Sequence, residues 1–179
     1  MSAAYCLAAP SSPLHGPYHD EEYGFPSRDE AVLFERLVLE INQAGLSWAT
    51  ILRKRVAFRE AFAGFDVDRV AAFGSGDAER LMNDPGIIRN RLKIAAVIDN
   101  AKRVQELRRD YGSFAAWLDA NHPRTREEWV KLFKKTFRFT GGEIVNEFLM
   151  SLGYLDGAHA ADCPVYARIA ALDPPWAKK

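Results

Sequence analysis

The sequence predicts an all-α fold. Apolar residues recur at helical spacing, as in Val32, Leu33, Leu37 and Ile41, and this period is typical of an amphipathic helix. No segment of useful length alternates apolar and polar residues as a half-buried strand would. Of the 179 residues, 48% are apolar and 27% are charged. A chain of this size and composition is predicted to form one domain, residues 1–179, with its own core.

Capping signals indicate where two of the helices begin. Ser27, with Glu30 three residues later, matches a capping box, and the helix that follows is expected to end near Gly45. Thr125 and Glu128 repeat the capping pattern before a second amphipathic segment. Both segments are therefore predicted to be helices with defined first turns.

Shorter helices are predicted between and after these two. Asp66 and Asp77 are candidate N-caps of two short helices. Residues 91–110 form a longer amphipathic pattern, and the segment "GEIVNEFLMSLGY" predicts another helix that ends near Gly153. The chain contains no linker and no internal repeat.

A helix, a tight turn and a second helix are predicted at about residues 77–110. Leu81 closes the first helix, the turn contains Gly86, and the second helix begins near Arg91. The Gly-Ile-Ile turn matches a helix-hairpin-helix, whose backbone N–H groups and helix dipole can bind a phosphate. The candidate DNA-binding residues here are Gly86, Ile88, Arg89, Arg91 and Lys93. An ordinary αα turn is the alternative, and a phosphate contact would position DNA without reading its sequence.

Charge and composition limit the class of protein. The formal net charge is zero, which weighs against a broad basic nucleic-acid surface, although "RKR", "RNRLK" and "KLFKKTFR" are basic locally. Each of these segments alone is expected to be a solvated helix face. No apolar run approaches the roughly 20 residues of a membrane span, and no secretory signal is recognised. We expect a cytoplasmic monomer.

Four residues form a candidate metal site: Cys6, His19, His159 and Cys163. Two thiolates and two imidazoles are a standard ligand set for structural zinc, with no open position for catalysis. His159 and Cys163 would share one side of a helical turn, but the spacing of Cys6 and His19 is not that of a standard zinc finger. His15 is a competing ligand, and two free cysteines with unrelated histidines are the alternative.

Such a metal would tie the terminal segments, about residues 1–20 and 157–165, to each other. Irregular ends have little core of their own, and a metal ion can substitute for one. Two cysteines do not make a disulfide framework, and a reducing compartment disfavours even one bridge.

The chain resembles the DNA-3-methyladenine glycosylase I family in four stretches: "YHDEEYGFP" (18–26), "LEINQAGLSWATILRKR" (39–55), "GIIRNRLKI" (86–94) and "FRFTGGE" (137–143). Their order and spacing match over essentially the whole chain. The resemblance implies an all-helical helix-hairpin-helix DNA glycosylase fold. It also implies a structural zinc ion held by Cys6, His19, His159 and Cys163.

The activity implied by the resemblance is hydrolysis of the N-glycosidic bond of alkylated adenine (3-methyladenine) in double-stranded DNA. This step initiates base excision repair and requires the base to be flipped out of the stack. The resemblance makes Glu40 the catalytic carboxylate, Trp48 the stacking aromatic and Tyr18 a further base-binding aromatic. From the residues alone, Glu40 is expected at the surface and Trp48 in the core.

The physical basis of this selectivity is charge. An aromatic face attracts a cationic ring, and a carboxylate favours a charged base over neutral adenine. Leu46 is the candidate wedge that fills the gap left by the flipped base. We find no lysine placed as a Schiff-base nucleophile, so a monofunctional glycosylase is expected.

The sequence departs from the family pattern at several positions, among them Ala8, His15, Tyr23 and the helix after "FRFTG". That helix carries Glu143, Asn146 and Glu147 at spacings that share one side.

We therefore predict that Glu143 and Asn146 contact the base, with solvent exposure of both glutamates as the alternative. Two neighbouring carboxylates would raise one pKa and supply a general acid. Because of these departures, a zinc-stabilised helical DNA-binding module with lost or altered base specificity is the second hypothesis.

Overall fold

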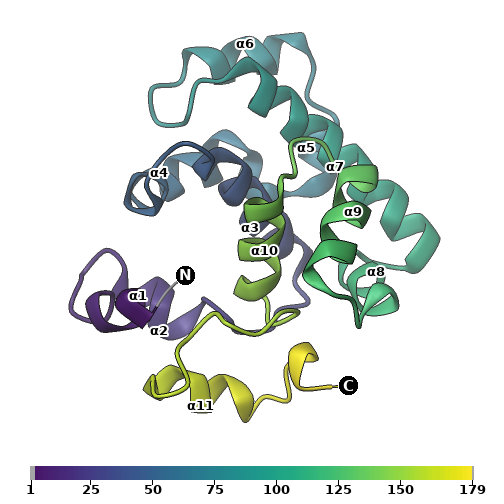
Figure 1. Ribbon diagram of the computed structural model, residues 1–179. Coiled ribbons are helices and arrows are strands. Elements are labelled where there is room, and N and C mark those ends of the chain that lie inside the picture. Colours follow the sequence, from purple (N-terminus) through teal and green to yellow (C-terminus); the bar gives the residue numbers. More distant parts are fainter. Residues whose placement is uncertain (1–2, 179) are drawn as a thin grey trace.

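The computed structural model describes residues 3–178, and within this range it is helical and has no β-strand (Figure 1). Residues 1, 2 and 179 belong to the predicted domain but lie outside the described residues. The helices are α1 (Ala3–Ala8), α2 (Gly16–Glu21), α3 (Glu30–Gln43), α4 (Trp48–Ala61), η1 (Ala63–Phe65), α5 (Val67–Ala71), α6 (Ser75–Asn83), α7 (Arg91–Tyr111), α8 (Phe114–Asn121), α9 (Arg126–Thr136), α10 (Gly142–Ser151), α11 (Pro164–Ala170) and η2 (Pro175–Ala177).

Capping explains most helix starts, and two predicted caps were wrong. The cap of α3 is Asp29, whose carboxylate accepts from the Val32 amide at 3.1 Å, so Glu30 is already helical and the Ser27 capping box does not form. The Asp77 side chain lies inside the first turn of α6, where it accepts from the Gly74 amide at 3.1 Å. In both cases a carboxylate still satisfies an N-terminal amide, but from a neighbouring position.

Other predicted boundaries are confirmed. Asp66 caps α5, and Thr125 and Glu128 form the capping box of α9. Helix α3 ends at Gln43, and Gly45 follows it with a φ of 85°, a left-handed conformation that favours glycine. The predicted helix after "FRFTG" is α10, which ends two residues before Gly153.

Helix α3 is the centre of the core. Its apolar residues, Leu33, Phe34, Leu37, Val38 and Ile41, are fully buried, and it packs against α4, α5, α7, α8 and α10. Figure 1 shows α3 and α10 together in the middle of the molecule. A helix buried on this many sides holds its side chains in fixed positions, which matters because α3 ends beside the candidate site.

A tight turn joins α6 to α7, as predicted. Asp84 Oδ1 accepts from the Gly86 amide at 2.7 Å, and Lys54 Nζ donates to the carbonyl oxygens of Pro85 at 2.8 Å and Gly86 at 3.2 Å. Asn90 then caps α7 by accepting from the amide three residues later, at 3.1 Å. The turn is thus fixed to α4 on one side and leads into the 21-residue helix α7 on the other.

The two ends of the described chain pack together. Val165 and Ile169 of α11 form a small core with Cys163, and Cys6 and Phe25 pack against it. In Figure 1, α1 and α2 lie beside the C-terminal segment that leads into α11. Among the described residues, no helix combines the length and apolar character needed to cross a membrane.

Candidate active site and metal centre

A cavity of about 260 Å³ opens where α3, α4 and α10 meet. It is lined by Glu40, Gln43, Trp48, Glu143 and Glu147. The cavity brings together one carboxylate from α3, two from α10 and the indole at the first position of α4. Aromatic surface and carboxylates around one small space are the chemistry expected for a planar cationic ligand.

Glu40 lies at the inner wall of this cavity and is only 3% exposed. The surface position expected from the residues alone is therefore wrong, because α3 is covered on several sides. Burial raises the pKa of Glu40 well above its usual value, the negative charge of Glu147 adds to this, and the buried cation of Arg36 opposes it. Glu40 is thus a carboxylate for which ionisation is costly until a cation arrives.

Trp48 forms the aromatic wall. Ser47 caps α4 by accepting from the Thr50 amide at 3.2 Å. This cap fixes the first turn of α4, which begins with Trp48. The Tyr18 ring packs on Trp48 with centroids 5.0 Å apart and planes tilted by 54°. Trp48 Nε1 is buried and has no hydrogen-bond partner among the described residues.

Tyr18 is buried behind Trp48 and is not among the residues that line the cavity. A network of ion pairs holds it there. The Arg55 guanidinium lies 5.9 Å from the Tyr18 ring centroid and donates to both oxygens of Glu22, at 2.7 and 2.6 Å, and of Glu35, at 2.9 and 3.1 Å. Arg59 also binds Glu35, at 2.7 and 2.9 Å.

This network was not found from the sequence, where "RKR" was expected to be a solvated face. Only 14% of the Arg55 side chain is exposed. Burial of Glu35 acts to raise its pKa, but the hydrogen bonds from Arg59 and Arg55 outweigh burial and lower it. The network joins α3, α4 and the residue that follows α2, so it fixes the wall behind the cavity.

The three polar residues predicted to share one side of α10 have separate environments. Glu143 is 83% exposed at the cavity mouth and pairs with Arg126. Asn146 does not line the cavity, and its amide points to Met150 Sδ at 3.7 Å, so its expected base contact is not supported by the geometry. Glu147 lines the cavity and accepts from the Tyr23 hydroxyl at 2.8 Å. Helical spacing alone could not separate these three positions.

The four predicted metal ligands lie together. Their ligand atoms are all within 4.8 Å of one another. Cys163 Sγ is 3.6 Å from His159 Nδ1 and 3.9 Å from His19 Nε2, and Cys6 Sγ is 3.8 Å from His159 Nδ1. Both cysteines are free. Tetrahedral zinc with ordinary bond lengths would place sulfur and nitrogen about 3.6 Å apart, so the donor set fits this ion.

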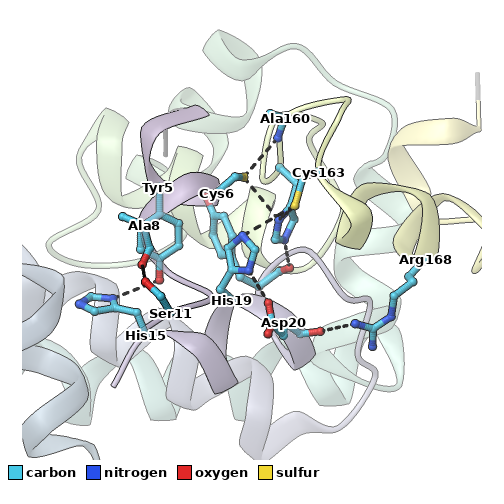
Figure 2. A network of polar contacts seen from close by, with 12 residues as sticks. Tyr5, Cys6, Ala8, Ser11, His15, His19, Asp20, Ala160, Cys163 and Arg168 are labelled. Carbon is cyan, nitrogen blue, oxygen red and sulfur yellow. Dashed lines mark hydrogen bonds and ion pairs between the residues drawn. The ribbon is translucent and has the colours of Figure 1, made fainter. Parts of the chain in front are cut away.

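The outward nitrogen of each imidazole has its own partner, and Figure 2 shows the partner of His19. His19 Nδ1 lies 2.6 Å from Asp20 Oδ1, and His159 Nε2 lies 2.7 Å from the carbonyl oxygen of Tyr23. Such outer hydrogen bonds select the tautomer that presents the other nitrogen to a metal. Sequence reasoning missed Asp20 in this role, although a carboxylate directly after a candidate ligand was the available signal.

His15 does not join the cluster. Its ring contacts Tyr5, with the hydroxyl 3.3 Å from His15 Nδ1 (Figure 2). Of the two candidate histidines in the N-terminal segment, His19 is therefore the one in the cluster. It is fully buried beside Cys163.

Lys93 is in a different place from the one predicted. Only 5% of the residue is exposed, and its ammonium donates to the carbonyl oxygens of Asn42 and Ala44, each at 2.9 Å. Burial lowers its pKa. A phosphate contact by this ammonium is thus incompatible with the structure, because the charge is used to cap the end of α3.

The other candidate DNA-binding residues lie near the surface. Arg89 and Arg91 are exposed at the start of α7, and Gly86 and Ile88 are half-buried in the turn before it. Leu46 is 39% exposed in the α3–α4 turn, which the Gln43 carbonyl closes by accepting from the Leu46 amide at 2.7 Å.

Known proteins resemble this chain in sequence. It matches the Methyladenine glycosylase family over residues 8–131. It is 36% identical over 180 residues to DNA-3-methyladenine glycosylase 1 of Escherichia coli (strain K12), which covers 90% of this chain and 96% of that protein. It is also 36% identical over 166 residues to DNA-3-methyladenine glycosylase of Haemophilus influenzae, with coverage of 82% and 89%.

Solved structures share the fold. The 3-methyladenine DNA glycosylase I of Staphylococcus aureus superposes with a TM-score of 0.81 at 33% identity, covering 92% of this chain and 97% of that one. A tyrosine-to-phenylalanine variant of 3-methyladenine DNA glycosylase I in complex with 3-methyladenine gives a TM-score of 0.80 at 34% identity, with coverage of 87% and 93%. The predicted all-helical architecture is therefore confirmed.

Proposed function

The chain belongs to the methyladenine glycosylase family, and from this premise we infer that it hydrolyses the N-glycosidic bond of 3-methyladenine in DNA. One observation carries the proposal beyond the family: Glu40 is buried against a cavity whose other wall is Trp48. A base-sized space with a buried carboxylate and an indole has the chemistry to hold a cationic purine. A binding module without catalysis has no need of this set.

The reaction exploits the charge of the lesion. Methylation at N3 makes the purine a cation, so the bond from its ring nitrogen to the sugar breaks with the electron pair leaving on a neutral base. Water adds to the sugar carbon and loses a proton to solvent. The enzyme must flip the nucleotide, at a cost of a few kcal/mol, and then favour the charged base over normal adenine.

Glu40 supplies this preference. In the empty cavity its ionised form is poorly solvated, which is why burial raises its pKa. A cationic base neutralises the carboxylate in a medium of low dielectric constant, where a charge pair is stronger than in water. Neutral adenine brings no charge to offset the cost of ionising Glu40 and therefore lacks this attraction.

Trp48 contributes the second part of the recognition. A cation over an indole face gains roughly 0.5–2 kcal/mol, depending on desolvation. Tyr18 acts from behind, since it packs on Trp48 and is buried. We therefore place Tyr18 as a positioning residue for the indole.

The DNA contacts we propose come from two turns. Leu46, exposed between α3 and α4 beside the cavity residue Trp48, would act as the wedge. The α6–α7 turn, with exposed Arg89 and Arg91, would act as a helix-hairpin-helix that binds phosphates. Gly86 and Ile88 would shape this turn.

We propose a monofunctional hydrolase with a structural zinc ion. Among the described residues, no lysine lines the cavity, which supports the absence of a Schiff-base step. Cys6, His19, His159 and Cys163 would hold the zinc. Four protein ligands close the coordination sphere, so the ion would stabilise the terminal segments and leave the chemistry to the cavity.

The test is base release from methylated duplex DNA, with the freed bases identified by mass spectrometry. The wild type should release 3-methyladenine, and Glu40→Gln should lower the rate by about 10²-fold, the scale seen when one stabilising polar group is removed from an active site. Glu127→Gln, on the exposed side of α9, is the matched control and should leave the rate unchanged. Absence of release by folded, zinc-loaded wild type would overturn the proposal.

A further inference from the structure

The cavity contains a second carboxylate at depth, and it comes from a different helix. Glu147 of α10 lines the same space as Glu40 of α3, and the two helices pack directly on each other. The electrostatic effect of Glu147 reaches Glu40, whose pKa is raised first by burial and then by the Glu147 charge. A ligand in the cavity would therefore lie within reach of both carboxylates.

A buried tyrosine fixes the position of Glu147. The Tyr23 hydroxyl donates to Glu147 Oε2 at 2.8 Å. Tyr23 is fully buried and packs between the rings of Tyr18, at 5.7 Å, and His159, at 5.6 Å, while its carbonyl oxygen accepts from His159 Nε2. This hydrogen bond and the packing around Tyr23 hold the Glu147 carboxylate in a fixed orientation at the cavity wall.

The neighbouring Glu143 does not share this environment. It is 83% exposed and its charge is compensated by Arg126. A solvated, paired carboxylate at the mouth contributes little to the field inside the cavity. Only Glu147 combines a position on the cavity wall with partial burial and a buried donor.

We propose that Glu147 is a specificity-determining residue, which acts with Glu40 to select purines that carry a delocalised positive charge from N-alkylation. The proposal rests on the function proposed above and names the substrate class by charge and not by the position of the methyl group. A cation in the cavity is attracted by both carboxylates, whereas a neutral purine gains neither attraction. Two carboxylates should therefore discriminate more strongly than one.

The experiment measures purine binding apart from base release. The quenching of tryptophan fluorescence gives the Kd of 3,9-dimethyladeninium, a permanent cation, and of 9-methyladenine, a neutral base with the same N9 substituent. The ratio of the two values is the cation preference. Glu147→Gln should lower this preference by about tenfold or more, since tenfold is the effect of one unit charge on another over about 12 Å at an effective dielectric constant of about 20. It should leave 9-methyladenine binding nearly unchanged.

Three further variants make the test specific. Glu147→Asp keeps the charge and should retain most of the preference, Glu143→Gln should change it less than Glu147→Gln, and Glu127→Gln should not change it. An unchanged preference in Glu147→Gln, or equal weakening of both ligands, would overturn the proposal. If Glu147→Gln does not fold, Tyr23→Phe decides: removal of the hydroxyl should reduce the preference, and an unchanged preference would count against it.

The two proposals fail in different ways. Wild type that binds the cation selectively but releases no methylated base from DNA would refute the proposed activity and leave the role of Glu147 standing. Wild type that releases 3-methyladenine, with a cation preference that Glu147→Gln does not alter, would refute only the role of Glu147.

Discussion

The ammonium of Lys93 lies 2.9 Å from the carbonyl oxygen of Ala44, at the end of the helix that carries Glu40. A cation is favourable at a helix C-terminus, where carbonyl groups lack partners inside the helix. The same ammonium binds the carbonyl oxygen of Asn42. Lys93 thus joins α7, on the proposed DNA-binding side, to the turn that presents Leu46.

Lys93→Met should therefore lower the stability of the protein and leave the count of phosphate contacts unchanged. Loss of the donor leaves buried carbonyl groups unsatisfied, at a cost of about 1–3 kcal/mol, measurable by urea denaturation. The logarithmic salt dependence of DNA binding should keep its slope, whereas Arg91→Gln should reduce the slope by about 0.9, the contribution of one phosphate. A similar reduction of the slope in Lys93→Met would show that Lys93 does contact a phosphate, as the sequence predicts.

The case of Lys93 shows how far sequence reasoning reached. Helical periodicity and turn chemistry placed α7 and α10 correctly, and α6 apart from its N-cap, because these signals are local. The same signals indicated that Lys93 and Arg91 lie near the start of one helix, but not which of them faces another element. Burial depends on what packs against a helix, and this information lies elsewhere in the chain.

In the candidate site, too, residue types and motifs were informative, whereas contacts between helices were not predictable. The resemblance to a family indicated Glu40 and Trp48, and the residue types Cys and His indicated the metal cluster. The Arg55 network and the separate environments of Glu143 and Glu147 were not predictable, because they depend on side-chain contacts between helices distant in sequence. Such contacts are set by tertiary packing and not by spacing along one helix.

Glu40→Gln should affect stability and activity in opposite directions. Burial and the nearby Glu147 raise the folded-state pKa of Glu40 above its unfolded value, so the folded protein binds this proton more tightly than the unfolded chain. The stabilising contribution is complete below the unfolded pKa, about 4.3, and is lost as the pH rises through the folded pKa. At pH 7 the unfolded chain is ionised at this position, so the wild type has begun to lose this contribution.

The glutamine variant cannot ionise and should unfold at higher urea concentration than wild type at pH 7, by an amount within the range of about 0.5–3 kcal/mol common for single substitutions. The advantage should shrink as the pH approaches 4. Glu127→Gln controls for the loss of an exposed carboxylate. A variant less stable than wild type at neutral pH would show that the burial of Glu40 is compensated by partners in the folded state.

Removal of metal should destabilise the protein strongly. If zinc bridges the terminal segments, a chelator should lower Tm by about 10 °C, since a few kcal/mol corresponds to shifts of this size in a chain of this length. Cys163→Ser should start from a low Tm and respond little to the chelator. Elemental analysis should find one zinc ion per chain in the wild type. A Tm that the chelator leaves unchanged would contradict the structural role.

Gly86→Ala should disturb the α6–α7 turn without altering the cavity. An added Cβ would lie 2.8 Å from the Ala57 Cβ and 2.9 Å from Asp84 Oδ1, and overpacking of this kind typically costs about 1–3 kcal/mol. DNA binding should weaken while the binding of free purines is retained. Gly76→Ala, in α6, has open space around its Cβ and should be neutral or stabilising. Equal purine binding losses in both variants would argue against a local effect.

The cluster of Cys6 and Cys163 also has a consequence for the order of events during synthesis. The two residues are 163 − 6 = 157 positions apart, and chains fold from the N-terminus as they leave the ribosome. Cys6 and His19 emerge first but cannot complete the cluster until residues 159–163 have followed. Helices α3 to α10 can therefore gather while Cys6 and His19 still lack the second pair of ligands. The two ends can join only after Cys163, the last ligand, has been synthesised. A prematurely terminated chain would contain Cys6 and His19 without the second pair of ligands.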